Sequence, residues 1–110
     1  MRNDKENIIV KPTFEFAIKI IEFAEELENN LKFIIAKQLL KSGTSIGANI
    51  REAQNAESKA DFIHKMKIAA KEVDETEYWL ELCKESKNYP YDEKLMSSIN
   101  DIKLVLSKNN

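Results

Sequence analysis

Several residue types on which other folds depend are scarce in this sequence. Two glycines and two prolines among 110 residues leave too few turn formers for a β-sandwich or a β-barrel. The single cysteine, Cys83, excludes an internal disulfide and suits a reducing compartment. No apolar run approaches the roughly 18 residues that span a bilayer, and the N-terminal residues lack the apolar core of a signal peptide. We therefore expect a cytoplasmic protein with no membrane partner.

The sequence is instead rich in charge, and the charge is unevenly distributed. With 33% charged and 43% hydrophobic residues, it has the composition of a helix-rich domain with solvated faces. We predict one domain over residues 1–110, with about 1–11 and 107–110 loosely ordered. The net charge of −2 argues against a dedicated nucleic-acid binder, but residues 32–71 carry 8 basic and 3 acidic groups and residues 72–93 carry 2 and 8. Such a dipolar pattern suits steering, head-to-tail assembly or RNA contact.

Apolar residues recur at helical spacing in four segments. Proline is tolerated in a first helical turn because its missing N–H would be unpaired there anyway, so Pro12 and Thr13 should begin the first helix. Ser58, with Asp61 three residues later, and Asp92 have the character of N-caps. We expect helices over about residues 12–27, 31–55, 59–86 and 93–106.

Short turns between these helices place sequence neighbours antiparallel. The prediction is an all-α, up-down-up-down antiparallel four-helix bundle. The expected core faces are Phe14, Ala17, Ile18, Ile21, Ala24 and Leu27; Ile35, Leu39, Ser42, Ile46, Asn49 and Ala53; Phe62, Met66, Ala69, Val73, Thr76, Leu80 and Cys83; and Leu95, Ser98, Ile99, Ile102, Val105 and Leu106.

The second helix contains an unusual stretch, residues 38–53, which holds both glycines, Gly43 and Gly47. Each glycine costs a helix interior roughly 1 kcal/mol relative to alanine. One alternative breaks the helix at residues 42–45. Because the apolar spacing stays in phase across the glycines, we favour one continuous helix.

Some residues beside the core faces have two interpretations. The smooth flank of the second helix serves either close packing within the bundle or a contact with another subunit, and the aromatic group of the third helix is either a subunit contact or a wedge in the core. Asn49 is either a register-setting polar core residue or merely half-exposed. The flank is Ala36, Leu40, Gly43, Gly47 and Gln54, and the aromatic group is Tyr78, Trp79 and Leu82.

Basic residues line the outer faces of the second and third helices. A charged outer face is ordinarily only solvated, but repeated copies of such a face would offer phosphate groups a polyvalent surface. The candidate nucleic-acid-binding residues are Lys37, Lys41, Arg51, Lys59, Lys65, Lys67 and Lys71.

Catalytic patterns are missing from the sequence. His64, the only histidine, lies about five helical turns from Cys83 and on another face, which disfavours a Cys-His pair or a metal site. Glu72, Glu75 and Glu77 lack the Glu-x-x-His arrangement of di-iron bundles. We expect no enzyme, cofactor, metal or small-molecule substrate; the remaining catalytic alternative is a composite site between subunits.

Residues 38–83 resemble a known family. The pattern is a leucine pair, then Ser-x-x-Ser-Ile-x-x-Asn-Ile-x-Glu, and then a helix with Glu-x-x-Tyr-Trp-Leu. It is similar to that of the 23S rRNA intervening-sequence proteins. These proteins are named for reading frames inside insertions in bacterial 23S rRNA genes. Ala53 departs from the glycine that many members have. The matching residues are Leu39, Leu40, Ser42, Ser45, Ile46, Asn49, Ile50, Glu52, Glu75, Tyr78, Trp79 and Leu80.

The resemblance implies a left-handed four-helix bundle that assembles as a non-catalytic homopentamer. The related accessory proteins of diversity-generating retroelements bind nucleic acid through basic surfaces. Two hypotheses follow. In the first, a homo-oligomer associates with RNA, ribosomal or other, through the basic residues; in the second, it is a structural or protein-interaction scaffold that binds no nucleic acid.

Overall fold

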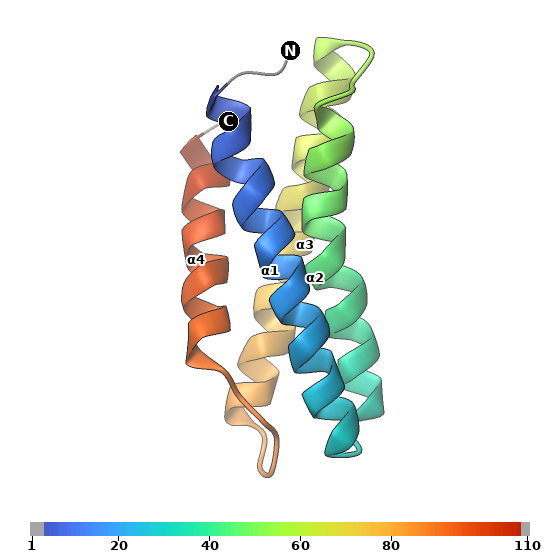
Figure 1. The fold of residues 1–110 in the computed structure, drawn as a ribbon, viewed down its shortest axis with the longest axis vertical. Coiled ribbons are helices and arrows are strands. Elements are labelled where there is room, and N and C mark those ends of the chain that lie inside the picture. The colour runs from blue at the N-terminus through green and yellow to red at the C-terminus, as the bar shows by residue number, and fades with distance from the viewer. Residues whose placement is uncertain (1–3, 109–110) are drawn as a thin grey trace.

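The protein is an antiparallel bundle of four helices, seen in a computed structural model that describes the backbone of residues 4–108 and the side chains of residues 8–108. The helices are α1 (Asp4–Asn29), α2 (Phe33–Ala53), α3 (Lys59–Glu85) and α4 (Glu93–Lys108). Each packs on its sequence neighbours, and α4 also packs on α1, which closes the bundle (Figure 1). The predicted all-α, up-down fold is confirmed. Within the described residues, no helix is long and apolar enough to cross a membrane.

Helix α1 begins earlier than predicted, at Asp4 rather than at Pro12. Pro12 therefore lies inside the helix, where it has no N–H for the Ile8 carbonyl. The helix continues through it because Ile9, Thr13 and Phe16 form one buried row, and the Thr13 hydroxyl donates to the Ile9 carbonyl at 2.7 Å. Residues 4–11 and 107–108 of the segments predicted to be loosely ordered are helical; residues 1–3 and 109–110 lie outside the described part of the chain.

The core face of α1 is rotated from the one predicted. Ala24 and Leu27 are buried as expected, and Ala17 is half-buried, but Phe14, Ile18 and Ile21 are 50%, 43% and 43% exposed. The helix is apolar around more than half of its circumference, so periodicity alone could not select the buried side. The buried residues are Ile9, Thr13, Phe16, Ile20, Phe23, Ala24 and Leu27.

Helix α2 is continuous through residues 42–45, as predicted. It begins at Phe33, because Leu31 adopts a left-handed conformation with φ 64° in the turn. Ala36 and Ile50 are buried in place of Ile35 and Asn49, which are half-buried. The Asn49 amide donates to the Ser45 carbonyl of its own helix at 2.8 Å, so the half-exposed alternative holds for this residue.

The predicted caps of α3 and α4 are present. Ser58 Oγ accepts the backbone N–H of Asp61 at 3.0 Å, and Asp92 Oδ1 accepts that of Lys94 at 2.9 Å. The core face of α3 is buried from Ala69 to Cys83, whereas its first two members, Phe62 and Met66, are half-buried. On α4, Ser98 is exposed, Val105 is half-buried, and the other predicted core residues are buried: Leu95, Ile99, Ile102 and Leu106.

Candidate functional site

The unusual stretch of α2 contacts α3 through polar groups in the core. The hydroxyls of Ser42 and Thr76 are 2.9 Å apart, and Thr76 Oγ1 also lies 2.7 Å from the Glu72 carbonyl. Ser42 and Thr76 are fully buried, so this pair satisfies two hydroxyls that would otherwise be costly to dehydrate. Towards its C-terminus, α2 contacts α3 again through an ion pair, in which Glu52 Oε1 lies 2.9 Å from Lys65 Nζ.

The two glycines of the same stretch lie against α1. A Cβ on Gly43 would be 2.7 Å from Ile20 Cγ1, and one on Gly47 would be 3.2 Å from the Thr13 carbonyl oxygen. Both positions therefore allow the backbones of α1 and α2 to approach closely. Ala36 is buried in the core, Gln54 is 9% exposed, and Leu40 is 40% exposed. Among the residues of the predicted flank, Leu40 is thus the one with a large apolar side chain left in solvent.

The seven predicted basic residues lie in different surroundings. Lys65 is held by Glu52, whose hydrogen bond and charge raise the pKa of the lysine. The Arg51 guanidinium lies over the ring of Phe14 at 5.3 Å. The other five are exposed: Lys37, Lys41, Lys59, Lys67 and Lys71.

A second group of exposed side chains on α3 is aromatic. Tyr78 is 56% exposed, and its ring meets that of Trp79 edge-on with centroids 5.3 Å apart. Trp79 and Leu82 are half-buried, and Trp79 Nε1 donates to Glu75 Oε2 at 3.1 Å. Ile34 of α2, 80% exposed, lies about five helical turns before Glu52 and so on the same edge of α2, the one that faces α3. We call Ile34, Tyr78, Trp79 and Leu82 the α2–α3 face.

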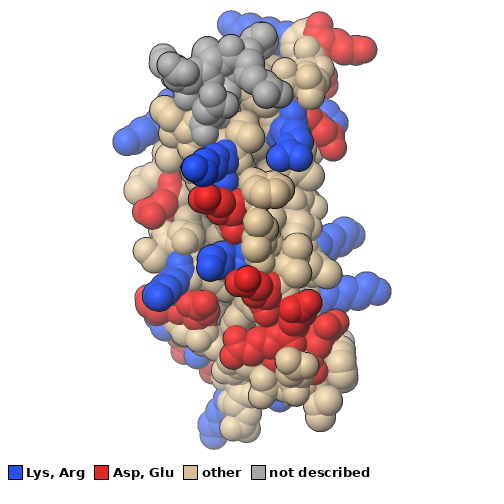
Figure 2. All heavy atoms as spheres, viewed as in Figure 1, with Lys and Arg blue, Asp and Glu red and all other residues tan. Residues whose placement is uncertain are grey.

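An exposed apolar surface lies over α1 and α2, and of its members only Leu40 was among the predicted interface residues. Ile21, Phe14, Gly47 and Arg51 line one hollow between these helices. Phe33, 57% exposed, lies about five turns before Arg51 on the same edge of α2. Figure 2 shows uncharged surface over the middle of α1 and α2, with acidic side chains gathered below it. We call the exposed apolar residues here the α1–α2 face: Phe14, Ile18, Ile21, Phe33 and Leu40.

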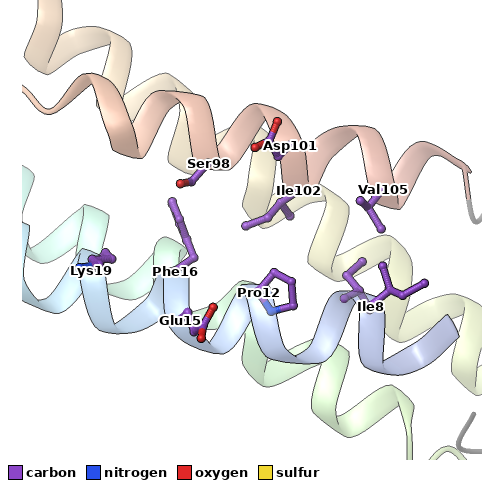
Figure 3. A pocket seen from close by; sticks show the side chains of 10 residues that line it. Ile8, Pro12, Glu15, Phe16, Lys19, Ser98, Asp101, Ile102 and Val105 are labelled. Atoms are coloured by element: carbon purple, nitrogen blue, oxygen red, sulfur yellow. The ribbon is translucent and has the colours of Figure 1, made fainter. Parts of the chain in front are cut away.

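A groove between α1 and α4 is the other hollow of note. One hollow in this groove, with a mainly apolar lining, has a volume of about 400 Å³. Figure 3 shows Phe16 and Ile102 pointing into it from the two helices, with Ile8 and Val105 facing each other at one end. A second hollow of about 440 Å³ continues it towards Glu26 and Asp92 and shares Lys19 and Ser98 with it.

The described residues offer little for catalysis. Burial raises the pKa of the Cys83 thiol to about 11, so it is protonated and a poor nucleophile at neutral pH. His64 is exposed on the surface of α3. Over the described part of the chain, no cluster of histidine, cysteine and carboxylate side chains could hold a metal ion.

The comparisons with known proteins decide the family. The family model described as 23S rRNA-intervening sequence protein matches residues 5–108. The chain belongs to the 23S rRNA-intervening sequence protein family. It is similar to a solved protein of unknown function from the S23 ribosomal protein family of Bacteroides thetaiotaomicron, with 44% identity, a TM-score of 0.89 and 96% of each chain covered. No curated protein matches the chain.

In this member of the 23S rRNA-intervening sequence protein family, the residues that carried the resemblance have structural tasks. Ile46 and Ile50 are fully buried, and Ser42 bonds across to α3. Ser45 Oγ donates to the Lys41 carbonyl at 2.6 Å and its own carbonyl accepts from Asn49. Neither the family nor the solved relative is described with a catalytic activity. These five residues of the pattern therefore encode how α2 packs.

Proposed function

We propose that this protein is non-catalytic and that several copies of it associate into a closed ring. The observation that carries the proposal is the presence of two exposed apolar faces on opposite edges of α2, the α1–α2 face and the α2–α3 face. Monomeric proteins rarely leave contiguous apolar patches in water, because covering them is favourable. The resemblance described above implies five copies, and five is the number we propose.

Two different faces favour a head-to-tail contact. When one face binds the other face of the next copy, the growing assembly keeps one free face of each kind at its two ends. If the rotation between neighbouring copies is suitable, these two ends meet and the ring closes. Carboxylates lie beside both faces, Glu25 and Glu28 on α1 and Glu75 next to Trp79 on α3, so the apolar side chains rather than the charges favour this pairing.

Two complementary variants test the proposal. Ile18→Asp places a charge on the α1–α2 face and Leu82→Asp places one on the α2–α3 face. Each variant alone should reduce the assembly to small species in sedimentation velocity. A 1:1 mixture should form a heterodimer, because each variant supplies the face that the other has lost. Leu104→Asp is the matched control, since Leu104 is 60% exposed on α4 and outside both faces.

A mixture that stays monomeric while the control assembles would contradict head-to-tail pairing. If both single variants assemble fully, neither face takes part in assembly and the proposal is wrong. Thermal melts of all three variants establish that each is folded, which is expected because the substituted positions are exposed or half-exposed.

A second candidate function is RNA binding by the assembled ring. What supports it is that Lys37, Lys67 and Lys71 are exposed on the outer faces of α2 and α3 and, among the described residues, make no ion pair. Five copies would repeat these cations, and avidity would raise a weak affinity. If phosphate contacts are made, log K for structured RNA falls steeply with log salt, and Lys67→Gln with Lys71→Gln reduces the slope. Absence of binding at low salt would exclude it.

A further inference from the structure

We infer that the groove between α1 and α4 binds a basic amphipathic helix from a partner protein. The groove lies away from α2 and so leaves both proposed assembly faces free. It is lined by Ile8, Pro12 and Phe16 from α1 and by Ile102 and Val105 from α4 (Figure 3). Their side chains form an apolar floor of the kind that receives the apolar side of a helix.

The dimensions of the groove suit a helix better than a compact small molecule. The two hollows, of about 400 and 440 Å³, lie end to end because both include Lys19 and Ser98. Along α1 they run from Ile8 to Glu26. At 1.5 Å per residue this is roughly 27 Å, the length of a helix of about 18 residues.

The charge of the rim selects a basic partner. Five carboxylates and two ammonium groups line the two hollows together. Lys19 is already 4.0 Å from Glu22, which leaves the rim with a clear negative excess. The carboxylates are Glu15, Glu22, Glu26, Asp92 and Asp101.

The rim groups are not used to join α4 to the bundle. Lys103 of α4 pairs with Glu77 at 3.0 Å and with Asp74 at 3.8 Å, and both carboxylates belong to α3. Among the described residues, no ion pair joins α1 to α4. Glu15 and Asp101 therefore flank the apolar floor from opposite helices, where the Lys or Arg side chains of a bound amphipathic helix would reach both.

Designed peptides provide the test. One 18-residue peptide carries leucines on one helical face and lysines and arginines on the other; its partner has glutamates in place of the basic residues. Fluorescence anisotropy with the full chain should give at least about ten-fold tighter binding of the basic peptide, and its affinity should fall with added salt. Equal affinity for the two peptides, or binding of neither, would overturn the inference.

Variants of the protein localise the binding. Glu15→Lys with Asp101→Lys should weaken binding of the basic peptide at least about ten-fold, so that the acidic peptide then binds more tightly than the basic one. Glu57→Lys with Glu85→Lys is the matched control; it makes the same change of charge at exposed positions outside the groove. Ser98→Trp, at the residue shared by both hollows, should block either peptide by bulk.

Three results would each refute the groove as the site. The first is an equal loss of affinity for the basic peptide in the rim variant, Glu15→Lys with Asp101→Lys, and in its control. The second is unchanged peptide binding in Ser98→Trp, and the third is a changed molar mass of the rim variant. The last would make the groove a contact between copies of this chain. Thermal melts confirm that the variants fold, so that lost binding cannot be lost structure.

Discussion

At the scale of single residues, small or polar side chains decide how α2 packs. Gly43 faces the branched carbon atoms of Ile20, which lie close to the α1 backbone and have little room to move. Ser42 and Thr76 place two hydroxyls in an otherwise apolar contact. These residues lower the helix propensity of α2, and they are tolerated because the tertiary contacts require them.

We predict that Gly43→Leu destabilises the protein by about 1–3 kcal/mol. Even the first carbon of the new side chain would be 2.7 Å from Ile20 Cγ1, so α1 and α2 must separate. Ala60→Leu, at an exposed position near the start of α3 and outside both faces, should change the free energy of unfolding by less than about 0.5 kcal/mol. Urea unfolding measures both. Equal stability of the two variants would contradict the close approach at Gly43.

Cys83 gives a prediction about pH. Burial raises the pKa of its thiol from the ordinary 9.0 to about 11 in the folded protein. The unfolded chain therefore loses this proton first, and the stability that the thiol contributes is present below pH 9 and is lost as pH rises towards 11. Urea midpoints of the wild type should fall more between pH 8 and pH 10.5 than those of Cys83→Ala. Parallel curves would mean that the thiol is not shielded.

At the scale of the helices, sequence reasoning succeeded where the apolar face was narrow. Helix α3 alternates one apolar row with charged residues, and its N-cap, its end and most of its core face were predicted. Helix α1 is apolar on several sides, so the spacing of Phe14, Ile18 and Ile21 fitted a core face as well as that of Phe16, Ile20 and Phe23. Which row is buried depends on how α2 and α4 lie beside it, and no single helix contains that information.

The proline rule also failed in α1 for a physical reason. Pro12 costs one backbone hydrogen bond, but starting the helix there would have removed Ile9 from the core, where it is 3% exposed. Burying a side chain of this size contributes about 1.5–3 kcal/mol, and the Thr13 hydroxyl supplies an added bond to the Ile9 carbonyl. Tertiary packing therefore outweighed the local signal.

The contact between α2 and α3 gives a prediction at this scale. Thr76→Val removes one hydroxyl and leaves that of Ser42 buried without a partner, at a cost of about 1–3 kcal/mol. Ser42→Ala combined with Thr76→Val removes both polar groups and should cost less than the sum of the single changes. Chemical denaturation of the four proteins completes the cycle. Strict additivity would show that the two hydroxyls do not interact.

At the scale of the whole molecule, the candidate surfaces depend on the arrangement of helices rather than on motifs. The sequence indicated Tyr78, Trp79 and the basic residues, because they could not all be placed in a core. Of the α1–α2 face it indicated only Leu40, and it did not indicate the α1–α4 groove, since both depend on which side of α1 is buried. The resemblance to the family led correctly to the fold; Ser42, Ile46 and Ile50 of its pattern serve helix packing, whereas Leu40 and Tyr78 are exposed.

The central claim is that copies of this chain assemble through their exposed apolar faces. Sedimentation equilibrium of the wild-type protein at micromolar concentration tests it most directly. We predict a molar mass of about 64 kDa, five times the 12.7 kDa of one chain, that stays the same over a ten-fold dilution. A mass of 12.7 kDa at every concentration would contradict it, because both apolar faces would then be stable in water.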